Sequence, residues 1–177
     1  RVVPQKFLAA RVPQTLTGVL QARLDALKPA EKLALQQASV IGHVFWDQAL
    51  AAIDADAPAC LPAQPQRGLV VAHRETSLDG MHEYAFQHHL LHQVTYDTVL
   101  RRMRRDCHAK AAEWLAGLRG ARANDFLGAA AEHFERAGDS RRASDYLAKA
   151  AEHAGARHMH AAALTFIDKA LVLAAPE

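Results

Sequence analysis

The first third of the chain has apolar residues at three- and four-residue spacing, which predicts three helices. The first covers residues 12–27 and places five apolar side chains on one face: Leu16, Val19, Leu20, Leu24 and Leu27. Pro29 separates it from a second helix over residues 30–41, because proline lacks an amide donor and restricts the residue before it. We expect Gly42 to end this helix in a left-handed cap and residues 45–53 to form a third, short helix.

The pattern changes after the third helix. Three prolines within residues 54–67 argue against a long regular helix there. Residues 68–71 and 82–86 read as two strands on either side of a turn at residues 77–80. Three helices followed by two strands predict a winged-helix domain with a small two-stranded wing.

From residue 88 onward the chain reads as helix. Helices are predicted over residues 88–101, onward to 118, and then over 125–137, 140–154 and 157–174. The last three have the spacing of a tetratricopeptide unit, whose period is about 34 residues, with a tight turn at Gly138-Asp139. Fewer than three repeats fit, so we expect the array to continue beyond Glu177; the alternative is an alanine-rich bundle without repeat function. The predicted fold class is mainly α, a winged helix followed by antiparallel helical hairpins.

The composition and charge of the chain favour some classes of protein over others. The 177 residues are 50% hydrophobic and 23% charged, the balance of a soluble globular protein, and their net charge of +2 does not by itself indicate a nucleic-acid binder. Cys60 and Cys107 form no CxxC pair, and no apolar run reaches the ~20 residues of a membrane span. We therefore expect a cytoplasmic protein without a membrane partner. The start at Arg1 suggests a piece of a longer protein.

Several short motifs follow one another along the chain. They are VPQTL at residues 12–16, ARLDAL at 22–27, ASVIG at 38–42 with Phe45-Trp46, YAFQHHLL at 84–91, then Val94, Tyr96, Arg104-Arg105 and His108. With this series the chain resembles the C-terminal regulatory part of bacterial STAND-type signalling ATPases. Those proteins carry class III adenylate/guanylate cyclase domains or are large transcriptional regulators.

The resemblance implies three segments. Residues 1–27 would be the helical tail of an upstream ATPase domain, 28–105 the winged helix and 106–177 the tetratricopeptide-like repeats. ATP or ADP would bind in the upstream domain, because nothing in this chain matches the phosphate-binding loop GxxxxGKS/T. We therefore expect no catalytic residue and no cofactor in this chain.

The family's FxHxLL motif falls on Phe86, His88, Leu90 and Leu91. The resemblance implies that His88 faces the phosphate of bound ADP, where an imidazole at a helix start can donate a hydrogen bond. Exchange of ADP for ATP would release this contact and give a two-state switch. The alternative is that His88 caps a helix or packs inside its own domain.

The chain departs from the family pattern in two places. Gln93 stands where the family has an acidic residue, so a salt bridge made there is lost. The proline-rich residues 54–67 stand where the family has a regular helix. That helix would be the recognition helix of a DNA-binding winged helix, so major-groove recognition is doubtful.

One concentrated basic patch comprises Arg101, Arg102, Arg104, Arg105 and Lys110. It could face a phosphate-rich partner or an acidic surface of the neighbouring domain. Acidic residues that are near enough in sequence to pair with it along a helix are Asp97, Asp106 and Glu113. We favour a solvated, partly ion-paired helix face over a nucleic-acid interface.

The chain contains eleven histidines, which raises the question of metal binding. His88 and His92 lie one turn apart and could share a helix face, but the glutamate of HExxH is missing between them. Cys107-His108 or the pair His158 and His160 would add ligands only if the fold brought them close. We expect no metal site, and we expect Cys107 to be an inert helix cysteine.

The function expected from these observations is a non-catalytic regulatory and interaction module of a nucleotide-switched signal-transduction ATPase. The winged helix would couple the ADP or ATP state of the upstream domain to the repeats. The repeats would bind a protein, a peptide or a small inducer. The alternative is a DNA-binding winged-helix transcriptional regulator with the arginine patch on phosphates.

Overall fold

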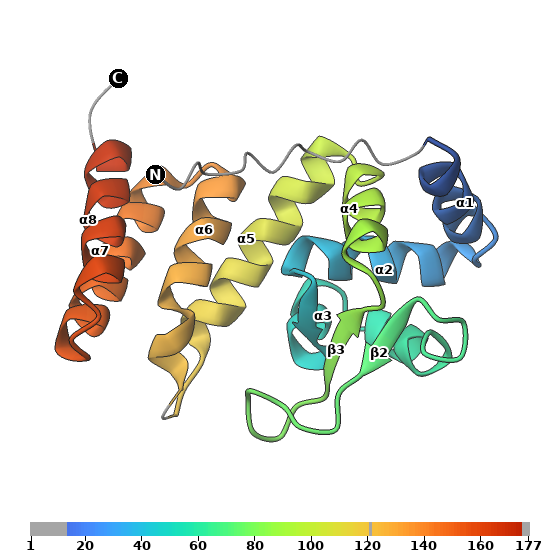
Figure 1. The fold of residues 1–177 in the computed structure, drawn as a ribbon, viewed down its shortest axis with the longest axis horizontal. Coiled ribbons are helices and arrows are strands. Elements are labelled where there is room, and N and C mark those ends of the chain that lie inside the picture. The colour runs from blue at the N-terminus through green and yellow to red at the C-terminus, as the bar shows by residue number, and fades with distance from the viewer. Residues whose placement is uncertain (1–13, 121, 175–177) are drawn as a thin grey trace, which may run out of the picture.

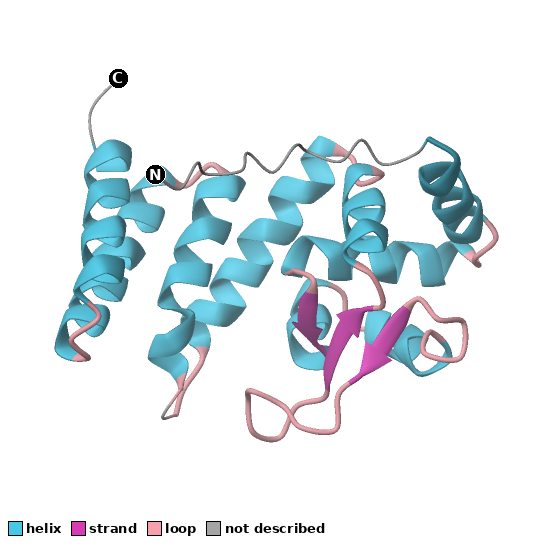
Figure 2. Ribbon diagram, viewed as in Figure 1, coloured by secondary structure: helices cyan, strands magenta, loops and turns pink. Residues whose placement is uncertain are grey.

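The computed structural model describes residues 14–120 and 122–174. Within them the fold is mainly helical, as predicted, with a small antiparallel sheet (Figures 1 and 2). The start of the helix predicted from residue 12, with the tail before it, lies outside the described residues.

The elements fall into two groups along the chain. The N-terminal part contains α1 (Gln14–Asp25), α2 (Pro29–Ile41), β1 (Val44–Trp46), α3 (Asp47–Ile53), the 3-10 helix η1 (Ala57–Ala63), β2 (Val70–Ala72), β3 (Glu83–Phe86) and α4 (His89–Asp97). The C-terminal helices are α5 (Arg101–Gly117), the 3-10 helix η2 (Ala123–Phe126), α6 (Leu127–Ala137), α7 (Ser140–Ala156) and α8 (His160–Ala174). In Figure 1, α5 to α8 form an antiparallel row beside the sheet-bearing part.

The sheet has three strands in the order β1-β3-β2: the two predicted strands are β2 and β3, which pair antiparallel, and β1 is a third strand that was not predicted. β1 pairs with β3, with Val44 opposite Ala85 and Trp46 opposite Glu83. This strand was expected to be the start of the third helix, because Trp46 is followed by apolar residues at helical spacing. Valine and two aromatic residues in succession favour an extended strand once a partner strand lies alongside, and α3 begins only at Asp47.

Local signals explain most of the helix ends. Pro29 is at the start of α2, where Glu31 accepts a hydrogen bond from the backbone amide of Lys28 at 3.1 Å. Gly42 ends α2 as predicted, but its φ of 159° is extended rather than left-handed. Gly138 ends α6 in the left-handed conformation, with φ at 86°, and the Asp139 carboxylate then caps α7 by accepting from the Arg142 amide.

The region between α3 and β2 contains the proline-rich segment. It forms the seven-residue 3-10 helix η1 in place of a long α-helix, as its prolines predicted. The predicted helix over residues 88–101 is shorter than expected and ends at Asp97. Leu100 is extended and starts α5, while Arg104 donates to the freed carbonyls of Asp97 at 3.0 Å and Val99 at 2.8 Å.

The main core lies where α1, α2, α3 and α4 meet the sheet and α5. Its largest fully buried side chains include Phe45, Phe86, Leu35, Leu50, Leu61 and Leu91. Part of the apolar face predicted for residues 12–27 is exposed: Leu20 and Leu24 lie in the core and Leu27 packs against it, whereas Leu16 is 46% and Val19 57% exposed. A second, smaller core contains Ala112, Phe134 and Ala143.

α5 takes part in both cores. Cys107 and Ala111 pack into the main core, and Ala112 packs into the second. Trp114, also on α5, stacks on Trp46 of β1 with ring centroids 5.8 Å apart. α5 therefore connects the sheet-bearing part to the C-terminal helices through side chains on different faces of one helix.

A buried carboxylate joins β1 and β3 to the loop between β2 and β3. Glu83 of β3 is 8% exposed and accepts hydrogen bonds from the Trp46 indole (3.1 Å), the Ser77 amide (2.9 Å) and the Ser77 hydroxyl (2.5 Å). His73, just after β2, contacts its other oxygen at 2.8 Å. Burial by itself would raise the pKa of Glu83, but these hydrogen bonds outweigh it and lower the pKa to about 2.

We expect Glu83→Gln to lower the free energy of unfolding by about 1–3 kcal/mol at pH 7, because charge-assisted hydrogen bonds to a buried group are lost. The pKa of Glu83 lies below its ordinary value of 4.5, so its contribution is present above pH 4.5 and is lost as the pH falls towards 2. Urea unfolding of both proteins should therefore show a gap that narrows between pH 5 and pH 3. Glu75→Gln, an exposed glutamate in the same loop, is the matched control; a constant gap would contradict the assignment.

Candidate functional site

A pocket of about 460 Å³ lies where the C-terminal end of α2, α4 and α6 meet. We call it the junction pocket. Its polar lining comes from both parts of the molecule: His89, His92 and Tyr96 of α4, and Glu132, His133 and Arg136 of α6. Glu132 and Arg136 pair with each other at 2.5 Å, so the charges of these two side chains face each other within the lining.

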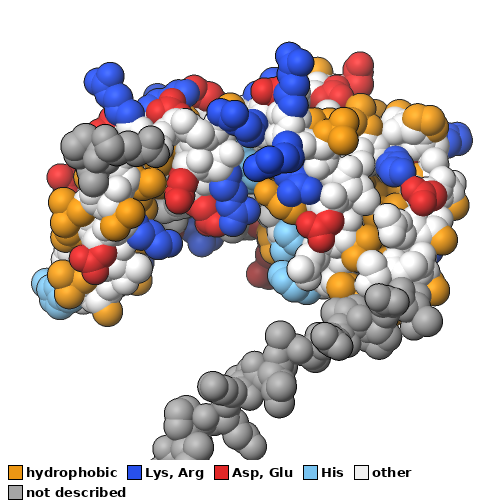
Figure 3. All heavy atoms as spheres, turned by 90° about the horizontal axis from the view of Figure 1, so that it is seen from above, with side chains coloured by type: hydrophobic (Ala, Val, Ile, Leu, Met, Phe, Trp, Pro, Cys, Tyr) orange, Lys and Arg blue, Asp and Glu red, His pale blue; other side chains and the backbone are white. Residues whose placement is uncertain are grey.

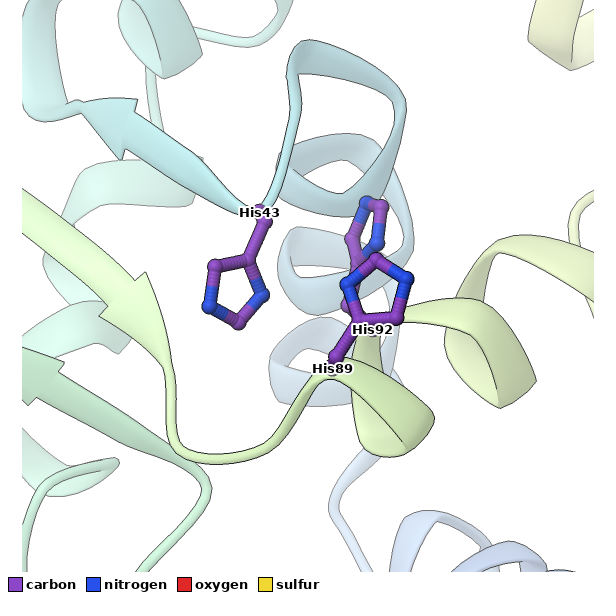
Figure 4. A group of neighbouring side chains, drawn as sticks. All are labelled: His43, His89 and His92. Carbon is purple, nitrogen blue, oxygen red and sulfur yellow. The ribbon is translucent and has the colours of Figure 1, made fainter. Parts of the chain in front are cut away.

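Three imidazoles gather beside this pocket and form what we call the histidine cluster: His43, His89 and His92 (Figure 4). His43 precedes β1, and its carbonyl accepts from the Phe86 amide at 2.9 Å, which holds it beside the start of α4. His89 and His92 are one turn apart on α4. The ring centroids are 5.7–6.0 Å apart, and each ring offers a nitrogen within 4.8 Å of the others.

The burial of His92 and His43 favours the neutral form of both rings. His92 Nε2 lies 2.9 Å from the carbonyl oxygen of Ser39, and because a carbonyl only accepts, this nitrogen carries the proton. Nδ1 of His43 is buried and has no hydrogen-bond partner among the described residues. Burial lowers the pKa of both His43 and His92, so both rings are favoured in the neutral form.

Separate from the histidine cluster, a pair of histidines is buried between α5 and α6. His108 Nδ1 and His133 Nδ1 are 2.8 Å apart, and His108 Nε2 is 3.1 Å from the Tyr96 hydroxyl. His133 also bonds the backbone of Ile41. Burial lowers the pKa of His108 to about 3 and that of His133 to about 4. Both are therefore neutral at physiological pH, and one proton is shared between their facing nitrogens.

The predicted nucleotide contact, His88, is exposed at the start of α4. Its backbone is extended, with φ −141° and ψ 142°, and its side chain makes no capping hydrogen bond. It is His89, and not His88, whose ring lies in one group with that of His92. The reason is that α4 begins one residue after His88, and helical spacing counts only from there.

The predicted basic patch is divided by the fold. Arg101 and Arg102 are exposed. Arg104 is occupied by the carbonyls that end α4 and lies over the Tyr96 ring at 4.4 Å, and Arg105 donates to the Ala137 carbonyl at the end of α6. Over this side of the molecule, basic and acidic side chains are interspersed (Figure 3).

Lys110 of the basic patch and its predicted partner Glu113 bind to other elements of the structure instead of to each other's helix face. Lys110 donates to the Ile53 carbonyl at 2.6 Å and so caps α3. Glu113 pairs with Arg142 of α7 rather than with an arginine on its own helix. These contacts hold helices together, and they leave Arg101 and Arg102 as the exposed members of the patch whose side chains make no hydrogen bond or ion pair with the described residues.

The other residues considered as ligands or nucleophiles lie apart from the cluster. Cys107 is buried, and burial raises the pKa of its thiol to about 11, consistent with an inert cysteine. Ser77 is engaged with Glu83. Among the described residues, neither Cys107-His108 nor the exposed pair His158 and His160 joins a group of three potential ligands.

A second hollow lies between α6, α7 and α8, with a volume of about 830 Å³. We call it the C-terminal groove. Its walls mix apolar side chains, among them Met159 and Phe166, with the charged side chains of Glu135, Arg157 and Lys169. None of the described helices has the length and hydropathy of a membrane span.

Sequence reasoning missed His43, His89 and His133. Their grouping depends on the β1–β3 pairing, which brings the end of α2 beside the start of α4, and on the packing of α6 against α5. The local signal in the sequence was His43 directly before the aromatic strand β1, together with His89 in the first turn of α4, the helix that follows β3.

We expect the stability of this chain to fall as the pH drops from 7 to 5. The pKa values of His108 and His133 in the folded chain lie below the ordinary value of 6.5, so only the unfolded state takes up protons there, and stability is lost below pH 6.5. His133→Gln should lower stability at pH 7 but lose about 1 kcal/mol less than the wild type between pH 7 and pH 5.5. Urea unfolding measures both. His160→Gln, whose ring is in solvent, should keep the wild-type slope; an unchanged slope in His133→Gln would argue against a neutral buried pair.

Comparison of the chain with protein-family models, with curated proteins and with solved structures found no match. Its function is therefore inferred from its own residues and geometry.

Proposed function

We propose that this chain is a non-catalytic regulatory and interaction module of a nucleotide-switched signal-transduction ATPase. The N-terminal part, as a winged helix, would contact the upstream ATPase domain that holds ADP or ATP. The C-terminal helices, as tetratricopeptide-like repeats, would bind a protein, a peptide or a small inducer. The observation that carries the proposal is the position of α5 in both cores, because a displacement of one part would then be transmitted to the other.

The order of elements in the N-terminal part supports the winged-helix assignment. α2, β1, α3, η1, β2 and β3 follow one another, and β1 lies on the far side of β3 from β2. The position of a recognition helix would fall to η1, whose sequence APACLPA has no basic side chain. Arg67, just beyond it, pairs with Glu31 at 3.0 Å. This region favours a regulatory role over major-groove recognition, which needs side chains that reach base edges.

The surroundings of His88 support a contact with an anionic ligand of another domain. Its side chain is exposed and free of a capping bond, and the first turn of α4 contains no acidic residue. The amides at the start of a helix attract phosphate, and an imidazole beside them can add a hydrogen bond. ADP held by an upstream domain would meet both features at this point.

The C-terminal helices support an interaction role. The C-terminal groove is lined by three successive helices, as expected of a stacked helical array. α8 contains no buried residue among those described, and its exposed apolar side chains are Leu164, Ile167, Leu171 and Val172. A further helix or a bound partner would cover this face.

We expect His88→Ala to weaken ADP binding in the protein that carries this chain together with its ATPase domain. The loss of one charge-assisted hydrogen bond should cost about 1.5–3 kcal/mol, which is roughly ten- to a hundredfold in affinity. Calorimetry measures it, with circular dichroism as a check of the fold. His160→Ala, another exposed histidine, is the control and should bind ADP like the wild type.

Two results would overturn this proposal. One is a complete coding sequence without a phosphate-binding loop upstream of this chain. The other is tight binding of this chain to duplex DNA that weakens steeply with salt, which would favour the transcriptional regulator. Unchanged ADP affinity in His88→Ala would leave the module but remove His88 from the switch.

A further inference from the structure

The histidine cluster has the composition of a transition-metal site. Its three candidate ligands are all imidazole nitrogens, one each from His43, His89 and His92. Imidazole suits Zn²⁺, Cu²⁺, Ni²⁺ and iron, whereas Mg²⁺ and Ca²⁺ prefer oxygen ligands. Three protein ligands with room for a fourth form the usual arrangement of an open zinc site.

The surroundings prepare two of the rings for metal binding. The Ser39 carbonyl holds the proton of His92 on Nε2, so the lone pair is on Nδ1. A ligand histidine that donates its other N–H to a backbone carbonyl is a recurrent feature of metal sites, because the contact fixes the tautomer and the ring orientation. The buried Nδ1 of His43 has no partner among the described residues, and a polar atom of this kind calls for one from outside the chain.

The distances allow closure of the site by small side-chain movements. The ligand nitrogens lie within 4.8 Å of one another, and around a tetrahedral ion with bonds of about 2.0–2.1 Å they would lie roughly 3.4 Å apart. His89 is exposed and can rotate, whereas His43 and His92 are partly buried and the Ser39 carbonyl holds the His92 ring. Figure 4 shows His43, from the loop before β1, across from His89 and His92 at the start of α4.

The charge around the cluster is compatible with a cation. Arg136, the basic side chain in the lining of the junction pocket, is paired with Glu132. His89 and His92 also line that pocket, so a ligand could reach the ion from it.

We propose that His43, His89 and His92 bind a divalent transition-metal ion, with Zn²⁺ as the ion they suit best, and leave a coordination position open to the junction pocket. A bound ion would tie the loop between α2 and β1 to the first turn of α4. This proposal concerns the chain by itself and does not depend on the proposed function.

The test uses the 177-residue chain without a histidine tag, stripped with a chelator and titrated with Zn²⁺ by calorimetry. We expect one ion per chain. His89→Ala should weaken binding by at least about tenfold to a hundredfold, which is the loss produced by removing only an outer contact of a metal ligand. Because His89 is exposed, this variant should fold like the wild type. Saturating Zn²⁺ at about 100 times its Kd should raise the Tm of the wild type by roughly 5–10 °C.

Two control variants make the result specific. The double variant His158→Ala with His160→Ala removes the exposed pair whose ring centroids are 6.1 Å apart, and should keep the wild-type affinity. His88→Ala removes the exposed neighbour of His89, which is not part of the cluster, and should also keep the wild-type affinity. Any of three results would overturn the proposal. They are a loss of affinity in either control, an unchanged affinity in His89→Ala, and no binding to the wild type at about 100 µM Zn²⁺, which corresponds to roughly −5.5 kcal/mol. Titration with Co²⁺ adds a spectroscopic check, because its visible absorption reports nitrogen ligands in a four-coordinate site.

Discussion

The structure depends on the packing of α5 against two cores at once. Consecutive residues of a helix point about 100° apart, so Ala111 and Ala112 face different neighbours. Ala111 packs into the main core, where α5 contacts α2 and α3, whereas Ala112 packs with Phe134 and Ala143. Their small side chains allow helices on both sides to approach closely. A change on either face of α5 therefore alters how the sheet-bearing part sits against the C-terminal helices.

The same helix contributes a polar contact to this junction. His108 of α5 lies between Tyr96 of α4 and His133 of α6, and the low pKa of both histidines keeps them neutral. A buried polar pair avoids a large desolvation cost only while every nitrogen finds a partner. The contact therefore favours one register of α6 against α5, since a shift along the axis would leave these nitrogens unpaired. An apolar pair would not impose this specificity.

Periodicity and turn residues were sufficient to predict the helices with an amphipathic face. α2, α6 and α7 lie within a few residues of their predicted ranges, and Gly138-Asp139 forms the predicted turn. β1 could not be predicted, because its residues form a strand only beside β3, which lies almost forty residues further along the chain. The histidine cluster was missed for the same reason, since His43 reaches α4 through that pairing. The basic patch was overestimated because sequence does not show which arginines bond to backbone carbonyls, as Arg104 and Arg105 do.

The two proposed sites are adjacent at the start of α4. The proposed ADP contact, His88, and the proposed metal ligand, His89, are consecutive residues. His88 is the extended residue before the helix, and its side chain is in solvent, whereas His89 is the first helical residue and turns toward His43 and His92. A ligand at the cluster would immobilise the first turn of α4, and an anion bound at His88 would meet a helix start with fixed amides. The two contacts would then be coupled through the backbone of α4, because ordering the turn for one ligand lowers the entropy cost of the other. This coupling requires no contact between the two ligands, only the shared first turn of a short helix.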